Sequence, residues 1–168
     1  AQFGDGPIDW RRYTTMIDLS GHKTDSHRQE TDTISRLIYG FASAYLLTGE
    51  DRFLEAAESG TDYLREHFRA QDSTEEITYW YHAIEANAGV ATRKILSSRM
   101  ADIPGMRRNA RGAHLHERKM LASEFSDDYQ AIPAYEQIYA LAGPTQTYRI
   151  SGDPAIRHDI DWTLNLFQ

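Results

Sequence analysis

The sequence contains no cysteine at all. This absence excludes a disulfide bond, a thiolate nucleophile and a zinc site with cysteine ligands. It also removes any sign of an oxidising compartment, so the cytoplasm is the expected location. No apolar run approaches the roughly 18 residues of a membrane-spanning helix, and the N-terminus lacks a basic-then-apolar signal. We therefore expect a cytoplasmic protein that makes no contact with a membrane.

Positive charge is also scarce, because 18 Lys and Arg stand against 25 Asp and Glu and give a formal net charge of −7. General binding to nucleic acid needs a basic face that displaces counterions from phosphates, so it is not expected. With 40% apolar and 26% charged residues, the 168-residue chain has the composition of one folded domain. Small neutral ligands or other proteins are the expected partners.

What the sequence does contain is a helical hairpin between Ser35 and Phe68. A glycine, Gly49, follows the first helical period where a helix needs a left-handed residue to end. Asp51 is a natural cap for the second helix, and so short a connection requires an antiparallel return. The periodic apolar residues are Ile34, Leu37, Ile38, Phe41, Ala44, Tyr45 and Leu47, then Phe53, Leu54, Ala57, Leu64 and Phe68.

The turn of this hairpin recurs near the end of the sequence. Residues 45–51 (YLLTGED) align with residues 148–154 (YRISGDP), and Gly49 falls over Gly152. Because one hairpin cannot bury its own apolar face, a repeated hairpin indicates stacking of such units. The sequence therefore predicts an all-α fold, an array or toroid of α-hairpins.

The periodicity changes between the two copies. The run Ile77–Ile84 is β-branched and aromatic, which favours a short strand or extended edge over a helix. Residues 85–122 are interpreted as an insertion with one or two short helices. A helix is then expected to begin near Pro133, and Gly143-Pro144 should kink or break it. Residues 159–168 are expected to form a helix without a stop signal, which predicts a truncated polypeptide.

One side of the first helix is polar. Arg36, Tyr39, Gly40 and Ser43 share that side at spacing i, i+3, i+4 and i+7. A solvated face whose small residues allow close helix packing explains this stripe as well as a pocket wall does. In the pocket interpretation, an aromatic ring supports the arginine.

The histidines are not expected to bind a metal. His22 and His27 lie in a polar loop among basic residues, where exposed loop histidines are the simpler interpretation. His114 and His116 have no third ligand at a familiar spacing. Neither a metal nor a cofactor is predicted.

Three segments resemble the N-acylglucosamine 2-epimerase family, which includes cellobiose 2-epimerases and related aldose–ketose isomerases. They are the hairpin at 35–68, the aromatic run YWYHAIE at 79–85, and YEQIYALAGPTQTYRISGDP at 135–154. Many α-toroids share the TGED turn. Its combination with Tyr135, Gln137, Tyr139 and Ala140 makes the resemblance more specific.

The resemblance implies an (α/α)6 toroid, of which this chain supplies about three of six hairpins at roughly 50 residues each. It also implies an enediolate at C2 of an aldose, with the acid/base histidines on later hairpins. Arg36 matches the family's early pocket arginine and is the predicted catalytic residue, because a guanidinium stabilises the developing oxyanion. Tyr135 matches the tyrosine at the head of the repeat helix. The aromatic faces of Tyr39, Trp80 and Tyr139 suit the C–H surface of a sugar, so these side chains are predicted to bind substrate.

Two other functions stay open. The chain could be a non-catalytic interaction module, given the long insertion and the lack of a complete acid/base set. A glycoside hydrolase would need a carboxyl pair across a cleft. Glu124, Asp127 and Asp128 are the clustered acids that favour it, although helix capping explains them more simply.

The final helix is expected to lack a covering partner. A stacked array buries each hairpin against two neighbours, so the last one exposes its apolar side. We therefore predict association of the chain with itself or with a chain that carries later hairpins. The residues expected on this edge are Trp162, Leu164, Leu166 and Phe167.

Overall fold

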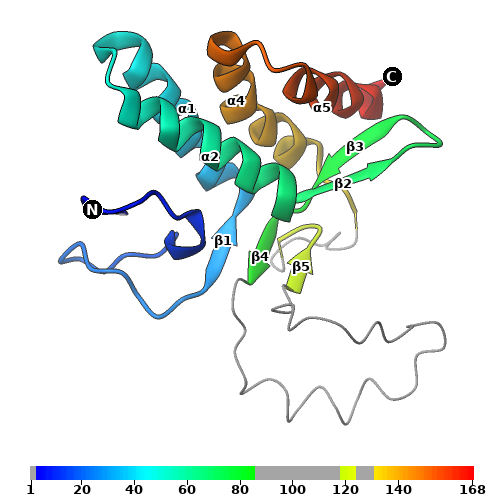
Figure 1. Ribbon diagram of the computed structural model, residues 1–168. Coiled ribbons are helices and arrows are strands. Elements are labelled where there is room, and N and C mark those ends of the chain that lie inside the picture. The colour runs from blue at the N-terminus through cyan, green and yellow to red at the C-terminus, as the bar shows by residue number, and fades with distance from the viewer. Residues whose placement is uncertain (1–2, 86–117, 124–130) are drawn as a thin grey trace, which may run out of the picture.

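Two antiparallel helical hairpins lie side by side in the structure (Figure 1). The computed structural model describes residues 3–85, 118–123 and 131–168. The first hairpin joins α1 (Thr31–Thr48) to α2 (Asp51–His67), and the second joins α4 (Ala134–Ser151) to α5 (Pro154–Leu164). Helix α1 packs against both α2 and α4, so α1 and α4 form most of the interface between the hairpins. The hairpin predicted at 35–68 and the helix predicted from about Pro133 are confirmed.

Two antiparallel sheets accompany the helices, so the all-α prediction is wrong and the described part of the chain is mixed α/β. One sheet has the strand order β1-β4-β5, and the other is the hairpin β2-β3. The strand predicted within Ile77–Ile84 is confirmed, whereas polar strands such as β1 (sequence RQE) carry no apolar alternation that could have predicted them. The strands are β1 (Arg28–Glu30), β2 (Arg69–Asp72), β3 (Ile77–Trp80), β4 (Ala83–Glu85) and β5 (Arg118–Met120).

The predicted insertion at 85–122 lies largely outside the described residues. Its described part includes β5, which pairs with β4 so that Lys119 stands opposite Ile84. On its other edge β4 pairs with β1, with Ile84 opposite Gln29. The sheet thus joins the segment before α1 to segments far along the sequence.

The two helical turns have the same construction. Gly49 and Gly152 adopt left-handed backbone conformations with φ of 72° and 66°. The N–H of each glycine donates, at 2.8 Å, to the carbonyl of the first residue of its aligned segment, Tyr45 or Tyr148. Such glycine ends satisfy carbonyls that the last helical turn leaves unpaired. Thr48 and Ser151 each accept a further N–H bond, at 3.2 Å, from the residue two positions on. The predicted repeat of the turn is confirmed.

The same alignment runs through the helices. Ser43 and Gln146 are 103 residues apart, occupy equivalent positions in the two hairpins, and bond directly to each other at 3.1 Å. Adding 103 to a residue number in the first hairpin therefore gives its counterpart in the second.

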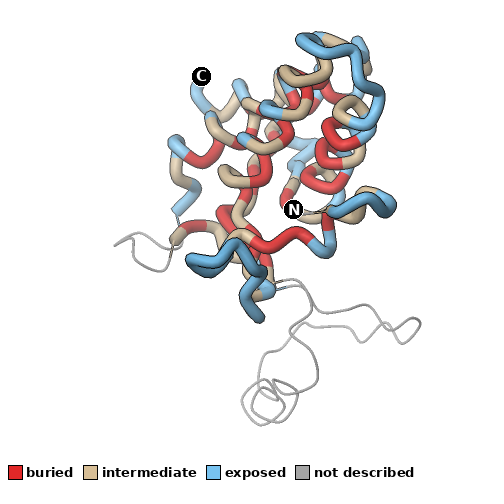
Figure 2. The backbone as a smooth tube through the Cα atoms, turned by 90° about the vertical axis from the view of Figure 1, so that its left-hand side faces the viewer, coloured by how far each residue is buried: buried red, intermediate tan, exposed pale blue. Residues whose placement is uncertain are grey.

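The core lies between the hairpins and under the N-terminal segment (Figure 2). Two buried tryptophans form hydrogen bonds with α2 and α5, the second helix of each hairpin. The indole N–H of Trp10 donates to the carbonyl of Ala56 in α2 at 3.2 Å, and that of Trp80 donates to the hydroxyl of Thr163 in α5 at 3.0 Å. The 3-10 turns that flank the fold are η1 (Trp10–Arg12) and η2 (Asn165–Phe167).

Helix α4 continues through Pro144, so of the kink or break predicted at Gly143-Pro144 the break is wrong. Proline has no N–H for the carbonyl four residues earlier, which here belongs to Ala140. The hydroxyl of Ser35 in α1 donates to that carbonyl at 3.0 Å and accepts the N–H of Gly143 at 2.8 Å. A neighbouring helix thus replaces the bond that Pro144 cannot make, which explains why α4 is uninterrupted.

We expect Ser35→Ala to lower the free energy of unfolding by about 1–3 kcal/mol, since it leaves the buried Ala140 carbonyl without a donor. In a Pro144→Ala background the same substitution should cost less, because residue 144 then supplies an N–H to that carbonyl. Urea unfolding of the four chains of this double-mutant cycle measures the difference. Equal costs in both backgrounds would contradict the role assigned to the Ser35 hydroxyl.

Candidate functional site

The predicted catalytic residue Arg36 lies on the exposed side of α1, one turn from Asp32. An ion pair and hydrogen bond join its guanidinium to the Asp32 carboxylate. The guanidinium carbon also lies 5.2 Å from the centre of the Tyr139 ring in α4. The hydrogen bond to Asp32 raises the pKa of Arg36, which keeps the side chain cationic. The result is a fixed cation at the surface, held between α1 and α4.

Tyr135 and Tyr139 extend this surface along α4. Their ring centres are 4.4 Å apart, and the Tyr135 side chain is exposed to solvent, with 57% of its surface accessible. A hydrogen bond with Tyr139 is the main cause that raises the pKa of Tyr135, so its hydroxyl stays protonated and can donate. The structure therefore brings together three of the five predicted site residues, Arg36, Tyr135 and Tyr139.

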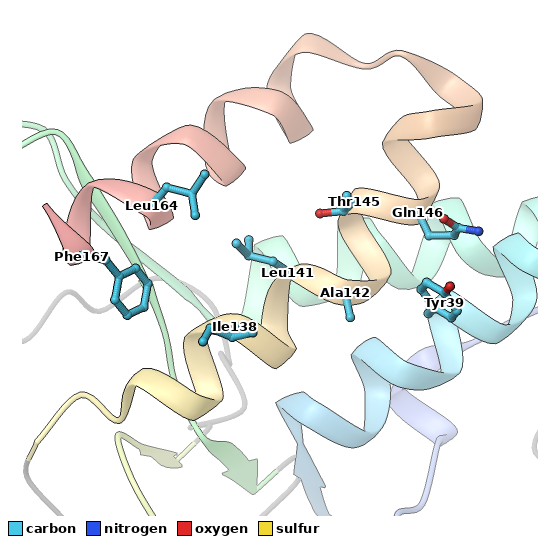
Figure 3. A pocket seen from close by; sticks show the side chains of 8 residues that line it. All are labelled: Tyr39, Ile138, Leu141, Ala142, Thr145, Gln146, Leu164 and Phe167. Atoms are coloured by element: carbon cyan, nitrogen blue, oxygen red, sulfur yellow. The ribbon is translucent and has the colours of Figure 1, made fainter.

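Tyr39 lies one turn further along α1 and faces a different feature. It lines an open groove of about 500 Å³ beside α4, α5 and η2 (Figure 3). We call this feature the C-terminal groove. Most of its surface is apolar, and its wall comprises Tyr39 together with Ile138, Leu141, Thr145, Leu164 and Phe167.

Trp80, the remaining predicted site residue, is not at this surface. Its side chain is fully buried, with 0% of its surface accessible. Its backbone N–H donates to the side-chain oxygen of Gln137 at 2.7 Å, and its carbonyl accepts from the Gln137 amide at 3.0 Å. Trp80 therefore joins β3 to α4 and α5, and its position in the core explains why an aromatic residue occurs here. Gln137, part of the resemblance, has the same structural role.

A buried histidine–glutamate pair was missed by the sequence interpretation. Nδ1 of His82, the residue immediately before β4, lies 2.7 Å from Oε1 of Glu136 in the first turn of α4. Its Nε2 lies 3.3 Å from a guanidinium nitrogen of Arg28. Because arginine only donates hydrogen bonds, Nε2 of His82 is the acceptor in this contact. Nδ1 then carries the hydrogen and donates a hydrogen bond to the Glu136 carboxylate. No spacing in the sequence links these residues, although His82 lies within the aromatic run at 79–85.

This pair is suited to positioning, not to proton transfer with a ligand. The hydrogen bond with Glu136 is the largest cause that raises the pKa of His82, and the positive charge of Arg28 opposes it. Both ring nitrogens of the buried imidazole are engaged. The second oxygen of Glu136 is buried without a hydrogen-bond partner in the described part of the chain. Together with Arg28 of β1, the pair links the segment between β3 and β4 to α4, next to Tyr135.

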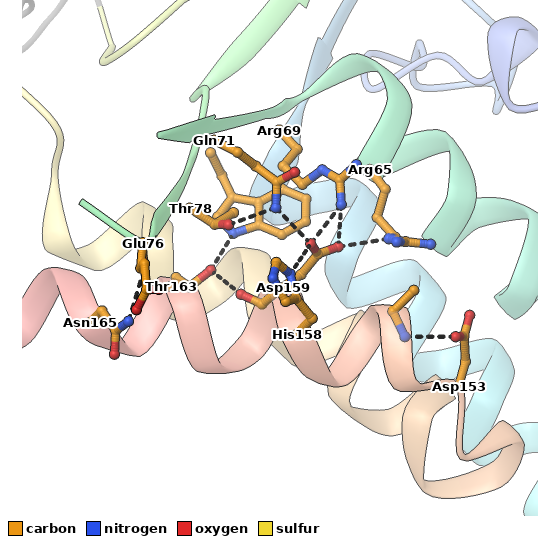
Figure 4. Close-up of polar contacts among 12 residues, drawn as sticks. Arg65, Arg69, Gln71, Glu76, Thr78, Asp153, His158, Asp159, Thr163 and Asn165 are labelled. Atoms are coloured by element: carbon orange, nitrogen blue, oxygen red, sulfur yellow. Dashed lines mark hydrogen bonds and ion pairs between the residues drawn. The ribbon is translucent and has the colours of Figure 1, made fainter. Parts of the chain in front are cut away.

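A second buried charge lies where α5 meets α2 and β2 (Figure 4). The carboxylate of Asp159 in α5 accepts from Nε of Arg65 at 2.6 Å and from Arg69 at 2.6 Å to both oxygens. Gln71 donates to it at 3.1 Å. Since both oxygens are engaged, this cluster joins α2, β2 and α5 and offers no open ligand position.

Among residues 3–85, 118–123 and 131–168, no group of three or more His, Asp or Glu side chains could hold a metal ion. The pair His114 and His116 and the acids Glu124, Asp127 and Asp128 lie outside the described residues. None of the helices in these described ranges has both the length and the apolar character that a membrane-spanning segment requires. Comparison with protein-family models, curated proteins and solved structures found no match.

Proposed function

We propose that this chain forms part of the sugar pocket of a carbohydrate epimerase or isomerase that acts through an enediolate at C2 of an aldose. The observation that carries the proposal is the placement of Arg36 between Asp32 and the ring of Tyr139, with Tyr135 exposed beside them. This surface offers a fixed cation next to aromatic rings. The resemblance to N-acylglucosamine 2-epimerases supports the same class of reaction.

The chemistry of the reaction explains what Arg36 contributes. Removal of the proton at C2 of an aldose moves negative charge onto the carbonyl oxygen. A preorganised guanidinium near that oxygen stabilises the transition state more than the neutral ground state, which lowers the barrier. Because Asp32 and Tyr139 already hold the side chain, little reorganisation is needed when the charge develops.

The tyrosines contribute binding. Ring faces pack against the C–H surface of a sugar, and a protonated phenol donates a hydrogen bond to a sugar hydroxyl. Tyr135 offers both, since its ring is exposed and its raised pKa keeps the hydroxyl protonated. The proposal assigns proton transfer to histidines on other hairpins, as the resemblance implies.

In the test, the native polypeptide is incubated with aldoses in deuterated water, and exchange at C2 is followed by NMR. Arg36→Ala should lower kcat by about 10²- to 10³-fold, the usual effect of removing one oxyanion donor. Arg157→Ala is the matched control, because Arg157 forms a similar exposed pair with Asp161, four residues away in α5. It should leave the rate unchanged.

An absence of both interconversion and exchange at C2 would overturn the enzymatic proposal. That outcome favours the second candidate, a non-catalytic interaction module. The exposed C-terminal groove is the observation that supports this candidate. The glycoside hydrolase alternative depends on Glu124, Asp127 and Asp128, which lie outside the described residues.

A further inference from the structure

The C-terminal groove has a counterpart in the first hairpin, and that counterpart is filled. Each of five groove residues corresponds, 103 positions earlier, to a residue of α1 or α2. All five counterparts have 0% of their surface exposed. In contrast, Ile138 is 61% exposed, and Leu164 and Phe167 are each 48% exposed. The pairs are Ser35 with Ile138, Ile38 with Leu141, Ala42 with Thr145, Thr61 with Leu164, and Leu64 with Phe167.

Helix α4 is what fills the counterpart groove. The carbonyl of Ala140 meets the hydroxyl of Ser35 at 3.0 Å, and the hydroxyls of Thr147 and Thr61 are 3.0 Å apart. Gly143 lies between these contacts and comes so close that an added Cβ would stand 2.8 Å from Cβ of Ile38. A hairpin of this repeat thus receives a helix that presents small residues at spacing i, i+3 and i+7.

The chemistry of the C-terminal groove suits the same kind of occupant better than a sugar. Its wall is mainly apolar, and the amide of Gln146 beside it is already bonded to Ser43 and Arg149. Figure 3 shows Leu141, Leu164 and Phe167 on the facing sides of α4 and the α5–η2 segment. A polar ligand finds few hydrogen-bond partners there, whereas an apolar helix would exclude water from these side chains.

We propose that the C-terminal groove is a docking surface for an antiparallel helical hairpin whose facing helix presents small side chains. In the docked arrangement the partner's small residues take the places that Ala140, Gly143 and Thr147 take against the first hairpin. The proposal is independent of the sugar chemistry, because it concerns the side of α4 and α5 that the first hairpin leaves uncovered.

A peptide with the sequence of the chain's own second hairpin can be used as a probe for this surface. A fluorescein-labelled peptide of residues 131–168 carries the α4–α5 hairpin that fills the counterpart groove. The peptide contains Pro144→Ala, because Ile138 stands where Ser35 stands in the first hairpin and has no hydroxyl for the carbonyl that Pro144 leaves free. Fluorescence anisotropy measures its binding to the 168-residue chain.

We expect saturable binding that Ile138→Glu or Leu164→Glu in the chain weakens by at least about tenfold, since each buries a carboxylate against the docked helix. Leu47→Glu is the matched control, because Leu47 is an exposed apolar residue of α1 away from the groove. It should leave the affinity unchanged. A Gly143→Leu peptide should bind at least about tenfold more weakly, because its facing helix is no longer flat.

Several results would overturn the proposal. One is the absence of binding at about 100 μM chain, which would limit the interaction to less than about 5.5 kcal/mol. Another is binding that Ile138→Glu and Leu164→Glu leave unchanged. That result would mean that the peptide displaces the chain's own second hairpin and does not bind in the groove. A third is a dimer of the chain alone, seen by sedimentation and dissociated by Ile138→Glu, which would assign the groove to a second copy. Circular dichroism confirms that each variant is folded.

Discussion

Asp159→Ala should lower the free energy of unfolding by about 3–5 kcal/mol, because removing one partner from a buried ion pair leaves uncompensated charge. The Asp159 side chain is 2% exposed, and its partners Arg65 and Arg69 are only 18% and 22% exposed. Neither guanidinium can reach full solvation without leaving the partly buried positions that α2 and β2 give it beside α5. Loss of the carboxylate also leaves the amide of Gln71 without one of its acceptors.

Asp161→Ala is the control for this prediction. Asp161 lies two residues further along α5 and pairs with Arg157, but both side chains of that pair are about half exposed. Exposed pairs contribute roughly 0–1 kcal/mol, so the control should change stability little. Urea unfolding at neutral pH measures both variants. Equal destabilisation by the two substitutions would show that burial of Asp159 does not decide its contribution.

Gly143→Ala should be strongly destabilising, although alanine is the better helix former. A Cβ at position 143 would stand 2.5 Å from the carbonyl oxygen of Ser35 and 2.8 Å from Cβ of Ile38. These are a backbone atom and a branched core side chain, so α1 and α4 must move apart. We expect a net loss of about 2–3 kcal/mol, from overpacking that exceeds the gain in helix propensity.

Gly40→Ala is its matched comparison, because Gly40 is the counterpart of Gly143 in the first hairpin. A Cβ at Gly40 meets no atom within 4 Å, so only helix propensity acts there. This substitution should raise stability by up to about 1 kcal/mol. Thermal unfolding followed by circular dichroism should therefore shift in opposite directions for the two variants. Shifts of the same sign would contradict the close approach of α1 and α4 at Gly143.

The local part of the fold could be predicted from the sequence, because its signals are local. Gly49 and Gly152 mark helix ends by backbone conformation, and the apolar period of α1 includes its buried Ile34 and Ile38, although Leu47 of the same period is 87% exposed. The strands β1 and β5 have polar sequences, and hydrogen bonds to β4 hold them in the sheet. Nothing in a three-residue polar segment indicates such a partner. The fold class was therefore wrong although most helices were right.

Pro144 shows the same limit within a helix. Its local rule predicts a kink or a break, and the rule is overridden by a hydroxyl from Ser35, more than a hundred residues earlier. A single sequence does not indicate that these two positions are in contact. Tertiary contacts of this kind decide whether a helix tolerates proline.

The candidate site shows the same distinction between local signals and tertiary contacts. Tyr135 and Tyr139 lie one turn apart on α4, so the sequence could predict that they are neighbours, whereas Arg36 lies on α1 and only the resemblance placed it with them. Aromatic character alone placed Trp80 with them, but a tryptophan is as well suited to a core, and that is its position. His82 lies between β3 and β4, whereas Glu136 lies in α4, and only the tertiary packing of these segments brings the two side chains together.

The bond between the Ser35 hydroxyl and the Ala140 carbonyl also restricts the order in which this sequence can change. A chain that first replaces Pro144 by a residue with an N–H keeps the carbonyl paired, so a later loss of Ser35 removes only the acceptor of the Gly143 N–H. A chain that first loses Ser35 must pass through an intermediate with a buried, unpaired carbonyl. Between the same two end points, one mutational path is open and the other crosses a stability barrier. Descendants of this sequence should therefore lose the proline before they lose the serine.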